Sequence, residues 1–256
     1  MRYKGFLLPL LFFCLSHSLV QESEKVYKLH SHNDYLQDVP FWIAYANQME
    51  SIEADVILMD NELYVAHEKE SIQDDRTLVS LYLDPIRKAF ELNLGPPKNF
   101  QLLIDIKTEP YAALNKLEEV LRNYRDILTG NQAKVSIVIS GNRPKTNEYS
   151  NYPDYIQFDY QSITDISDLP LDKIALISLN FNKLSSWKGE GKMVEQELEE
   201  LKKAIEIAHS LNKPLRFWAV PDTETAWKTL LDLGVDYINT DKPFEARYYL
   251  ETLVKE

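Results

Sequence analysis

Three histidines and an asparagine stand in two short stretches of this sequence. His30, His32 and Asn33 belong to LHSHNDYL, and His67 belongs to ELYVAHE. Free imidazoles titrate near pH ~6.5, so a pair of them can act as base and acid at neutral pH. Such a pair suits a displacement at phosphorus, in which one proton leaves the nucleophile and another reaches the leaving oxygen.

Three carboxylates interrupt otherwise apolar stretches. Glu53 and Asp55 lie two positions apart in SIEADVIL, so on a strand they share one face, and Asp105 lies in LLIDIKT. If these strands are neighbours, three like charges within a few ångströms require a cation. Oxygen ligands favour Mg²⁺ or Ca²⁺ over zinc. The alternative is a salt bridge of Glu53 or Asp105 with Lys107.

The pair His30 and His32 also has the spacing that begins a binuclear metallohydrolase site. Such a site needs further histidine ligands, and after His67 the sequence offers only His209. The histidine count therefore disfavours this alternative. His30 itself either contacts the phosphate or the metal ligands, or packs behind them, and we favour the packed position.

The elements that must position these residues alternate along the chain. Strand patterns stand at residues 26–32, 51–58, 100–108, 133–141, 154–160, 174–181, 214–221 and 235–240. Helix patterns stand at 40–49, 80–95, 110–128, 192–212, 223–234 and 243–256, and a hairpin arm at 62–68. Alternation of this kind predicts a parallel sheet covered by helices. Eight strands favour an α/β fold of the (β/α)8 TIM barrel type, with chemistry at the carboxyl ends of the strands.

Composition limits the partners. The chain has 256 residues and a formal net charge of -12, which disfavours nucleic acid and requires local neutralisation of an anionic substrate. Residues 1–20 combine basic residues, an apolar run and small residues, as in a signal peptide. We therefore expect an exported protein, periplasmic or secreted, although an uncleaved anchor is the alternative. Residues 26–256 are expected to form a single TIM-barrel domain.

The motifs HSHNDY, SIEADVIL, ELYVAHE, LLIDIKT and FWAV…LGVDYINTDKP, taken in order, resemble the glycerophosphodiester phosphodiesterase and PI-specific phospholipase C-like superfamily. The closest resemblance is to the branch that carries HNDY in place of HRG, and it covers residues 26–245. It implies a metal-dependent phosphoric diester hydrolase. By position, the resemblance implies that His32 and His67 are catalytic and that one divalent cation, Mg²⁺ or Ca²⁺, binds to Glu53, Asp55 and Asp105.

The resemblance also implies a substrate site. Lys107 matches a lysine that contacts the phosphate, and Trp218 matches a tryptophan that lines the cleft. Asn33 replaces the arginine of HRG at the phosphate, and Arg143, after the fourth strand, is a candidate replacement. The expected substrate is a small-molecule or lipid-derived phosphodiester, with no protein partner implied. A membrane-directed phospholipase C/D-like enzyme and a binding module on an inactive barrel are the alternatives.

Overall fold

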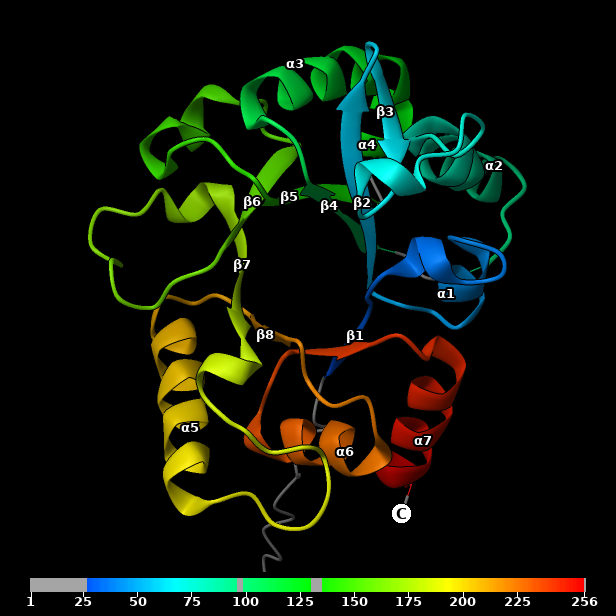
Figure 1. Cartoon of the computed structure of the whole chain (residues 1–256). Coiled ribbons are helices and arrows are strands. Elements are labelled where there is room, and N and C mark those ends of the chain that lie inside the picture. The colour runs from blue at the N-terminus through cyan, green and yellow to red at the C-terminus, as the bar shows by residue number, and fades with distance from the viewer. Residues whose placement is uncertain (1–26, 96–98, 130–134, 256) are drawn as a thin grey trace, which may run out of the picture.

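The chain forms a closed parallel barrel with one antiparallel arm (Figure 1). The computed structural model describes residues 27–95, 99–129 and 135–255. The strands are β1 (Lys28–Ser31), β2 (Ser51–Met59), β3 (Glu62–Val65), β4 (Phe100–Ile106), β5 (Val135–Gly141), β6 (Ile156–Tyr160), β7 (Ile174–Asn180), β8 (Leu215–Trp218) and β9 (Tyr237–Thr240). They follow the order β1-β9-β8-β7-β6-β5-β4-β2-β3, and pairing of β1 with β2 closes the ring. The predicted eight-stranded barrel is therefore confirmed, with β3 outside it.

The strands are apolar on both faces because helices cover the outside of the ring while side chains fill the inside. In β4, every residue except Asp105 is buried, and in β2 the first seven residues are buried. β3 pairs antiparallel with β2 through the turn at Asp60 and Asn61, both with positive φ, as the hairpin pattern predicted. The expected signal segment at 1–20 lies outside the described residues.

Helices surround the barrel in Figure 1. They are α1 (Trp42–Ala46), α2 (Asp84–Glu91), α3 (Pro110–Leu121), α4 (Arg125–Leu128), α5 (Glu195–Ser210), α6 (Glu224–Leu233) and α7 (Pro243–Lys255). Short 3-10 turns lie at Asp34–Leu36, Lys69–Ser71, Arg122–Tyr124, Thr146–Asn151, Leu171–Lys173 and Phe181–Lys183, and a π-helical turn at Val79–Leu83. The connections of β5 to β6 and of β6 to β7 contain 3-10 turns in place of helices.

Several helices are shorter than their patterns predicted. α1 ends at Ala46, and Gln48 takes a positive φ of 54° that no helix allows. The expected single helix at 110–128 is divided by the 3-10 turn at Arg122–Tyr124. Pro85 stands in the first turn of α2, where its missing N–H costs little, and the π-helical turn precedes it.

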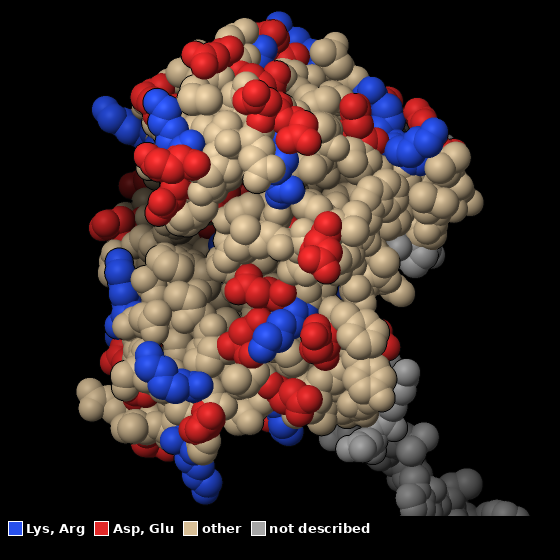
Figure 2. Space-filling model, turned by 45° about the vertical axis from the view of Figure 1, so that its right-hand side comes forward, with Lys and Arg blue, Asp and Glu red and all other residues tan. Residues whose placement is uncertain are grey.

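Charged side chains of both signs are interspersed over the face that Figure 2 shows. Within the described ranges, no helix combines the length and the apolar character that crossing a bilayer would take.

Candidate active site

A cavity of about 370 Å³ opens at the carboxyl ends of the barrel strands. Most of the residues that the sequence singled out line it: His32, Asn33, Glu53, His67, Asp105, Lys107 and Trp218. They come from β2, β4 and β8 and from the segments that follow β1 and β3. The barrel therefore brings together residues that lie far apart in the sequence.

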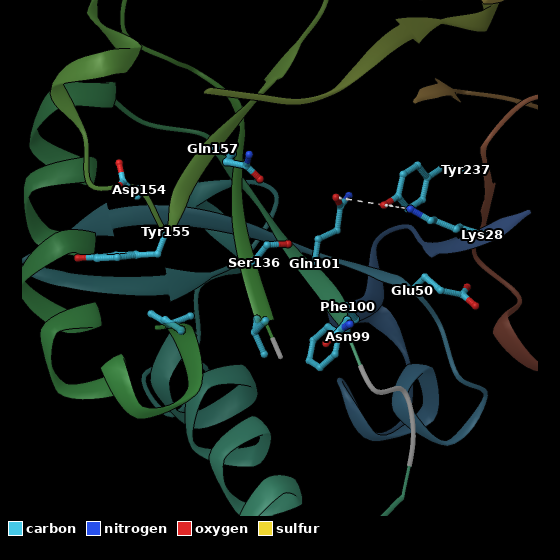
Figure 3. Close-up of a pocket in the computed structure, with 12 residues that line it drawn as sticks. Lys28, Glu50, Asn99, Phe100, Gln101, Ser136, Asp154, Tyr155, Gln157 and Tyr237 are labelled. Carbon is cyan, nitrogen blue, oxygen red and sulfur yellow. Dashed lines mark hydrogen bonds between the residues drawn. The ribbon is translucent and has the colours of Figure 1, made fainter. Parts of the chain in front are cut away.

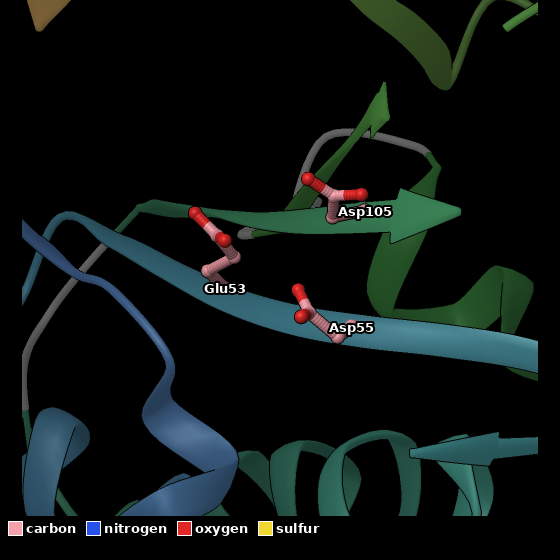
Figure 4. A group of neighbouring side chains, drawn as sticks. All are labelled: Glu53, Asp55 and Asp105. Carbon is pink, nitrogen blue, oxygen red and sulfur yellow. The ribbon is translucent and has the colours of Figure 1, made fainter. Parts of the chain in front are cut away.

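The strand register places the three carboxylates side by side (Figure 4). Asp55 of β2 is directly opposite Asp105 of β4, and Glu53 lies two residues earlier on the same face of β2. One oxygen from each of the three lies within 4.8 Å of the others. Charges this close in a buried site repel one another strongly unless cations lie between or beside them.

Asp55 is the hub of this cluster. Its Oδ2 accepts hydrogen bonds from Tyr35 (2.9 Å) and His67 (2.6 Å), and it lies 3.1 Å from Lys107 Nζ. Its Oδ1 is buried and has no hydrogen-bond partner in the described part of the chain. A buried carboxylate oxygen without a donor is costly, so a ligand of Oδ1 would remove a real penalty.

Asp105 stands against the backbone of β5. Its Oδ1 lies 3.1 Å from Lys107 Nζ. Burial raises the pKa of Asp105, Lys107 lowers it, and the charges of Glu53 and Asp55 raise it; together these effects give a pKa of about 6. A side chain on Gly141 would begin 2.1 Å from Asp105 Oδ1, so only glycine leaves room for this carboxylate.

Glu53 is held by Arg216 and His30, two buried side chains in the barrel interior. Its Oε2 accepts hydrogen bonds from Arg216 Nη1 (2.7 Å) and His30 Nε2 (2.8 Å). Burial opposes ionisation of Glu53, but the adjacent guanidinium overcomes it and keeps the pKa of Glu53 well below its usual range. His30 is fully buried, and burial together with the charge of Arg216 lowers its pKa to about 3. A neutral His30 thus lies beneath the cavity, in contact with a carboxylate of the cluster.

The rings of His32 and His67 are each oriented by a carboxylate. His32 places Nδ1 2.8 Å from Asp241 Oδ1, and its Nε2 lies 3.9 Å from Glu53 Oε1. His67 donates from Nδ1 to Asp55 and is 61% exposed. In each case a carboxylate holds Nδ1, which leaves Nε2 for a reactant. Burial lowers the pKa of His32, but the hydrogen bond to Asp241 and the charge of Glu53 outweigh burial, so the pKa of His32 is raised above that of a free imidazole.

The HNDY stretch builds the loop that carries His32. Asn33 takes the left-handed conformation (φ 47°), which asparagine tolerates well, and its Oδ1 lies 3.0 Å from the Tyr35 hydroxyl, whose one proton it shares with Asp55. Asp34 is fully buried and accepts from the backbone N–H of Phe41 and from the hydroxyl of Tyr82. The loop is thus fixed by its own polar residues.

Arg143 was expected to contact the phosphate, whereas no role was expected for Arg216. Arg143 does not stand among the described residues that line the cavity, and it interacts with Tyr149 instead. That Arg143 replaces the arginine of HRG therefore stays a prediction. Arg216, which the sequence analysis passed over, does line the cavity although only 3% of its side chain is exposed.

Two positioning side chains, Arg216 and Tyr35, escaped the sequence analysis, and Asp241 received no role in it. Arg216 interrupts the apolar strand LRFW, and a charge at such a position signals an interior partner. Tyr35 carries no such signal, because a tyrosine beside a strand is as easily a core residue. Asp241 follows the last strand, where a functional carboxylate and a surface one look alike.

A larger cavity, about 660 Å³, lies at the opposite end of the barrel (Figure 3). Its walls come from the amino ends of the strands and include Lys28, Gln101 and Tyr237, whose side chains form a chain of 3.5 Å contacts. None of the clustered carboxylates lines it. Because barrels of this kind carry their chemistry at the carboxyl ends of the strands, the smaller cavity is the candidate active site.

The carboxylate cluster fits a divalent cation. All three donors are carboxylates, which suits Mg²⁺ or Ca²⁺. The unpartnered Asp55 Oδ1 and the raised pKa of Asp105 are what such a cluster shows when its negative charge is not fully offset. Glu53, Asp55 and Asp105 are therefore the residues that would hold a cation.

Two family models match parts of the chain. Residues 20–101 match the AIM6-like phosphodiesterase domain, and residues 214–243 match the glycerophosphoryl diester phosphodiesterase family. The first match contains the HNDY loop and β2 with its two carboxylates. The second contains β8 with Arg216 and Trp218.

Curated relatives match most of the chain. The "Altered inheritance of mitochondria protein 6 homolog" of Arthroderma benhamiae is 26% identical, with 86% of this chain and 83% of the relative covered. "Altered inheritance of mitochondria protein 6" of Lachancea thermotolerans is 27% identical, with 87% of this chain but 65% of the relative covered. This chain thus spans about two thirds of the length of the yeast relative.

Solved structures share the fold. A glycerophosphodiester phosphodiesterase from Parabacteroides distasonis superposes with a TM-score of 0.60 at 16% identity, covering 90% of this chain and 98% of that one. A glycerophosphodiester phosphodiesterase from Agrobacterium tumefaciens gives 0.52 at 14% identity, covering 88% of this chain and 100% of that one. At these identities the likeness establishes the barrel type.

The expected export to the periplasm or the medium is wrong. The relatives from yeasts are named for the inheritance of mitochondria, which is at odds with a secreted protein. The apolar run at the amino end resembles a signal peptide in composition alone, and composition does not determine the destination of a chain.

Proposed function

Because this chain belongs to the glycerophosphodiester phosphodiesterase and phospholipase C-like superfamily, we propose that it is a metal-dependent phosphoric diester hydrolase in which His32 and His67 transfer protons. One observation carries this proposal. Two histidines, each held through Nδ1 by a carboxylate, line the same cavity as Glu53 and Asp105, two of the three clustered carboxylates. That set matches what cleavage of a phosphodiester requires.

Glu53, Asp55 and Asp105 would hold one Mg²⁺ or Ca²⁺. When bound, the cation supplies Lewis-acid stabilisation of the charge that develops on the phosphoryl oxygens. Lys107 Nζ is 3.1 Å from a carboxylate oxygen of Asp55 and 3.1 Å from one of Asp105, so the ammonium group lies beside the cation site. It offers the phosphate a second positive contact. Asn33 lines the cavity on the side of His32 and is the amide available to the phosphate.

The proton transfers follow from the orientation of the rings. His32 Nε2 removes a proton from the attacking water or substrate hydroxyl, and the hydrogen bond to Asp241 stabilises the imidazolium that forms. His67 Nε2 gives a proton to the leaving alkoxide as its P–O bond breaks, with Asp55 supporting the ring through Nδ1. Each transfer contributes roughly 10²–10⁴ in rate.

Trp218 lines one wall of this cavity and also of an adjoining cavity of about 150 Å³. The two cavities together accept a phosphate and a small alcohol group attached to it. Trp218 is accordingly the residue that contacts the alcohol portion of the substrate.

A second candidate substrate is a phosphodiester presented at a lipid surface. Leu36 is 72% exposed and Phe244 is 63% exposed, and each lies within a few residues of the hydrogen bond between Gln37 and the Asp241 carbonyl. Exposed apolar side chains that form one patch mark a contact with a partner or a membrane. This observation favours testing lipid substrates alongside soluble ones.

The test is hydrolysis of a soluble chromogenic phosphodiester and of phospholipid vesicles, each with Mg²⁺ or Ca²⁺ and with EDTA. The proposal expects cation-dependent hydrolysis of at least one substrate. Faster hydrolysis of vesicles than of the soluble ester supports the lipid-directed alternative. Hydrolysis that survives EDTA, or none of either substrate with either cation, refutes the proposal.

Histidine variants test the proton transfers. His32→Ala and His67→Ala should each retain less than about 1% of the rate, in keeping with the contribution of one acid or base. The control is His209→Ala, because His209 pairs with Asp236 away from the cavity. If His67→Ala keeps more than about a tenth of the rate, His67 is not an acid in this reaction.

A further inference from the structure

Arg216 lies inside the barrel, beneath the carboxylate cluster. Its Nη1 donates to Glu53 Oε2 at 2.7 Å and also contacts His30, and its Nε donates to Ser178 Oγ at 3.1 Å. Its Nη2 lies 4.0 Å from Asp159. A guanidinium this deeply buried persists only where several partners satisfy it.

The two oxygens of Glu53 are not equivalent. Arg216 and His30 both occupy Oε2, and Oε1 is the oxygen that faces His32, at 3.9 Å. A carboxylate held through one oxygen cannot rotate freely, so its other oxygen keeps one direction. That direction decides whether Glu53 can share a cation with Asp55 and Asp105.

We propose that Arg216 is a positioning residue for the cation site: it clamps Glu53 through Oε2 so that Oε1 stays available to a divalent cation. This inference rests on the proposed metal-dependent reaction. Side chains that orient a metal ligand from behind contribute strongly to affinity, although they never touch the metal. Arg216 thereby acts through Glu53 and not on the substrate.

The clamp requires an arginine. The planar guanidinium reaches Ser178 from Nε and Glu53 from Nη1, so two contacts fix its orientation. A lysine keeps the positive charge but offers one rotating ammonium on a flexible stem. Arg216→Lys therefore removes the clamp while the charge of the site stays the same.

The test is a titration of the full chain with Mn²⁺, followed by electron paramagnetic resonance of the free ion. Arg216→Lys should raise the Mn²⁺ dissociation constant roughly 10-fold to 100-fold. Its lost activity should return as Mn²⁺ is raised, with KM for the phosphodiester unchanged at saturating Mn²⁺. The control is Arg247→Lys, which alters an Arg–Glu50 pair outside the cavity and should leave the dissociation constant unchanged.

Ser178→Ala provides a second variant that is gentler to the fold. It removes the Nε contact of Arg216 without touching a carboxylate, so it should weaken Mn²⁺ binding in the same direction and by less. If Arg216→Lys does not fold, the result with Ser178→Ala decides. The inference is overturned if folded Arg216→Lys binds Mn²⁺ with wild-type affinity or if Arg247→Lys loses as much Mn²⁺ affinity as Arg216→Lys does. It is also overturned if Arg216→Lys has a raised KM for the phosphodiester that saturating Mn²⁺ does not restore. Failure of the wild-type chain to bind Mn²⁺ would instead refute the proposed metal site.

Discussion

Gly141 gives the sharpest single test of the carboxylate cluster. It ends β5 with φ +66°, and a Cβ at this position would lie 2.1 Å from Asp105 Oδ1 and 2.6 Å from the Ile106 carbonyl. Ordinary van der Waals contact begins near 3.4 Å, so in Gly141→Ala the Asp105 carboxylate must retreat by more than 1 Å. The substitution moves a proposed ligand without changing any charge.

Two separable costs follow. An alanine with positive φ costs roughly 1–2 kcal/mol of strain, which corresponds to a fall in Tm of roughly 2–8 °C for a domain of this size. Displacement of a catalytic group by about 1 Å costs on the order of 100-fold in rate. Gly191 is the matched control, because its φ is +61° and a Cβ there has no atom within 4 Å. Gly191→Ala therefore incurs the strain without the collision.

The assay is kcat for the chromogenic phosphodiester together with the dissociation constant for Mg²⁺ or Ca²⁺ by calorimetry. We expect Gly141→Ala to lose about 100-fold in rate and to bind the cation more weakly. Gly191→Ala should show the fall in Tm with wild-type rate and affinity. If both variants bind the cation equally well, Asp105 is not a ligand and the reasoning fails.

Three further perturbations test the neighbouring groups. Asp241→Asn removes the part of the upward shift of the His32 pKa that comes from Asp241, while the part from Glu53 remains. Activity should therefore persist to lower pH than in the wild type while its maximum falls, and a profile of kcat/KM against pH checks this. Because the pKa of Asp105 is raised to about 6, protons should compete with the cation for this carboxylate. The affinity for the cation, measured by calorimetry, should fall as the pH is lowered from 7.5 through 6 and should not change with pH above 7.5. Tyr35→Phe removes the donor to Asp55, and unfolding in urea should show a loss of roughly 1–3 kcal/mol; an unchanged midpoint would mean that Asp55 finds another donor.

The barrel could be predicted because its signals are local and repeated. Apolar strands alternate with amphipathic helices, and each pattern is evident in windows such as 100–108 and 192–212 without knowledge of the rest of the chain. The departures occur where tertiary context decides. α1 ends early at Ala46, and the single helix expected at 110–128 is divided by the 3-10 turn at Arg122–Tyr124.

The carboxylate cluster was also predictable, for a geometric reason. Side chains two apart on a strand share a face, and neighbouring parallel strands align, so Glu53, Asp55 and Asp105 had to converge if β2 and β4 are adjacent. The partners of these residues were not predictable. Whether Arg216 or Lys107 neutralises Glu53 depends on the order of the eight strands in the closed ring. It also depends on how far a long side chain reaches across the barrel interior.

The charge balance of the cavity argues that a cation is needed for binding as well as for chemistry. Lys107 and Arg216 line the cavity, but both already pair with carboxylates of the cluster. Three carboxylates against these two cations leave a net negative charge, and a phosphodiester monoanion entering a chain of net charge -12 would be repelled.

A divalent cation reverses the sign of the cluster, and the monoanion then completes a neutral site. A non-hydrolysable phosphodiester, such as a phosphonate analogue, should therefore bind at least 10-fold more tightly with Mg²⁺ or Ca²⁺ than with EDTA, a difference of about 1.4 kcal/mol. Calorimetry measures both values, with sodium sulfate at matched ionic strength as the control for screening. Equal affinity with and without the cation would mean that Lys107 and Arg216 alone neutralise the phosphate, and the carboxylates would then be structural.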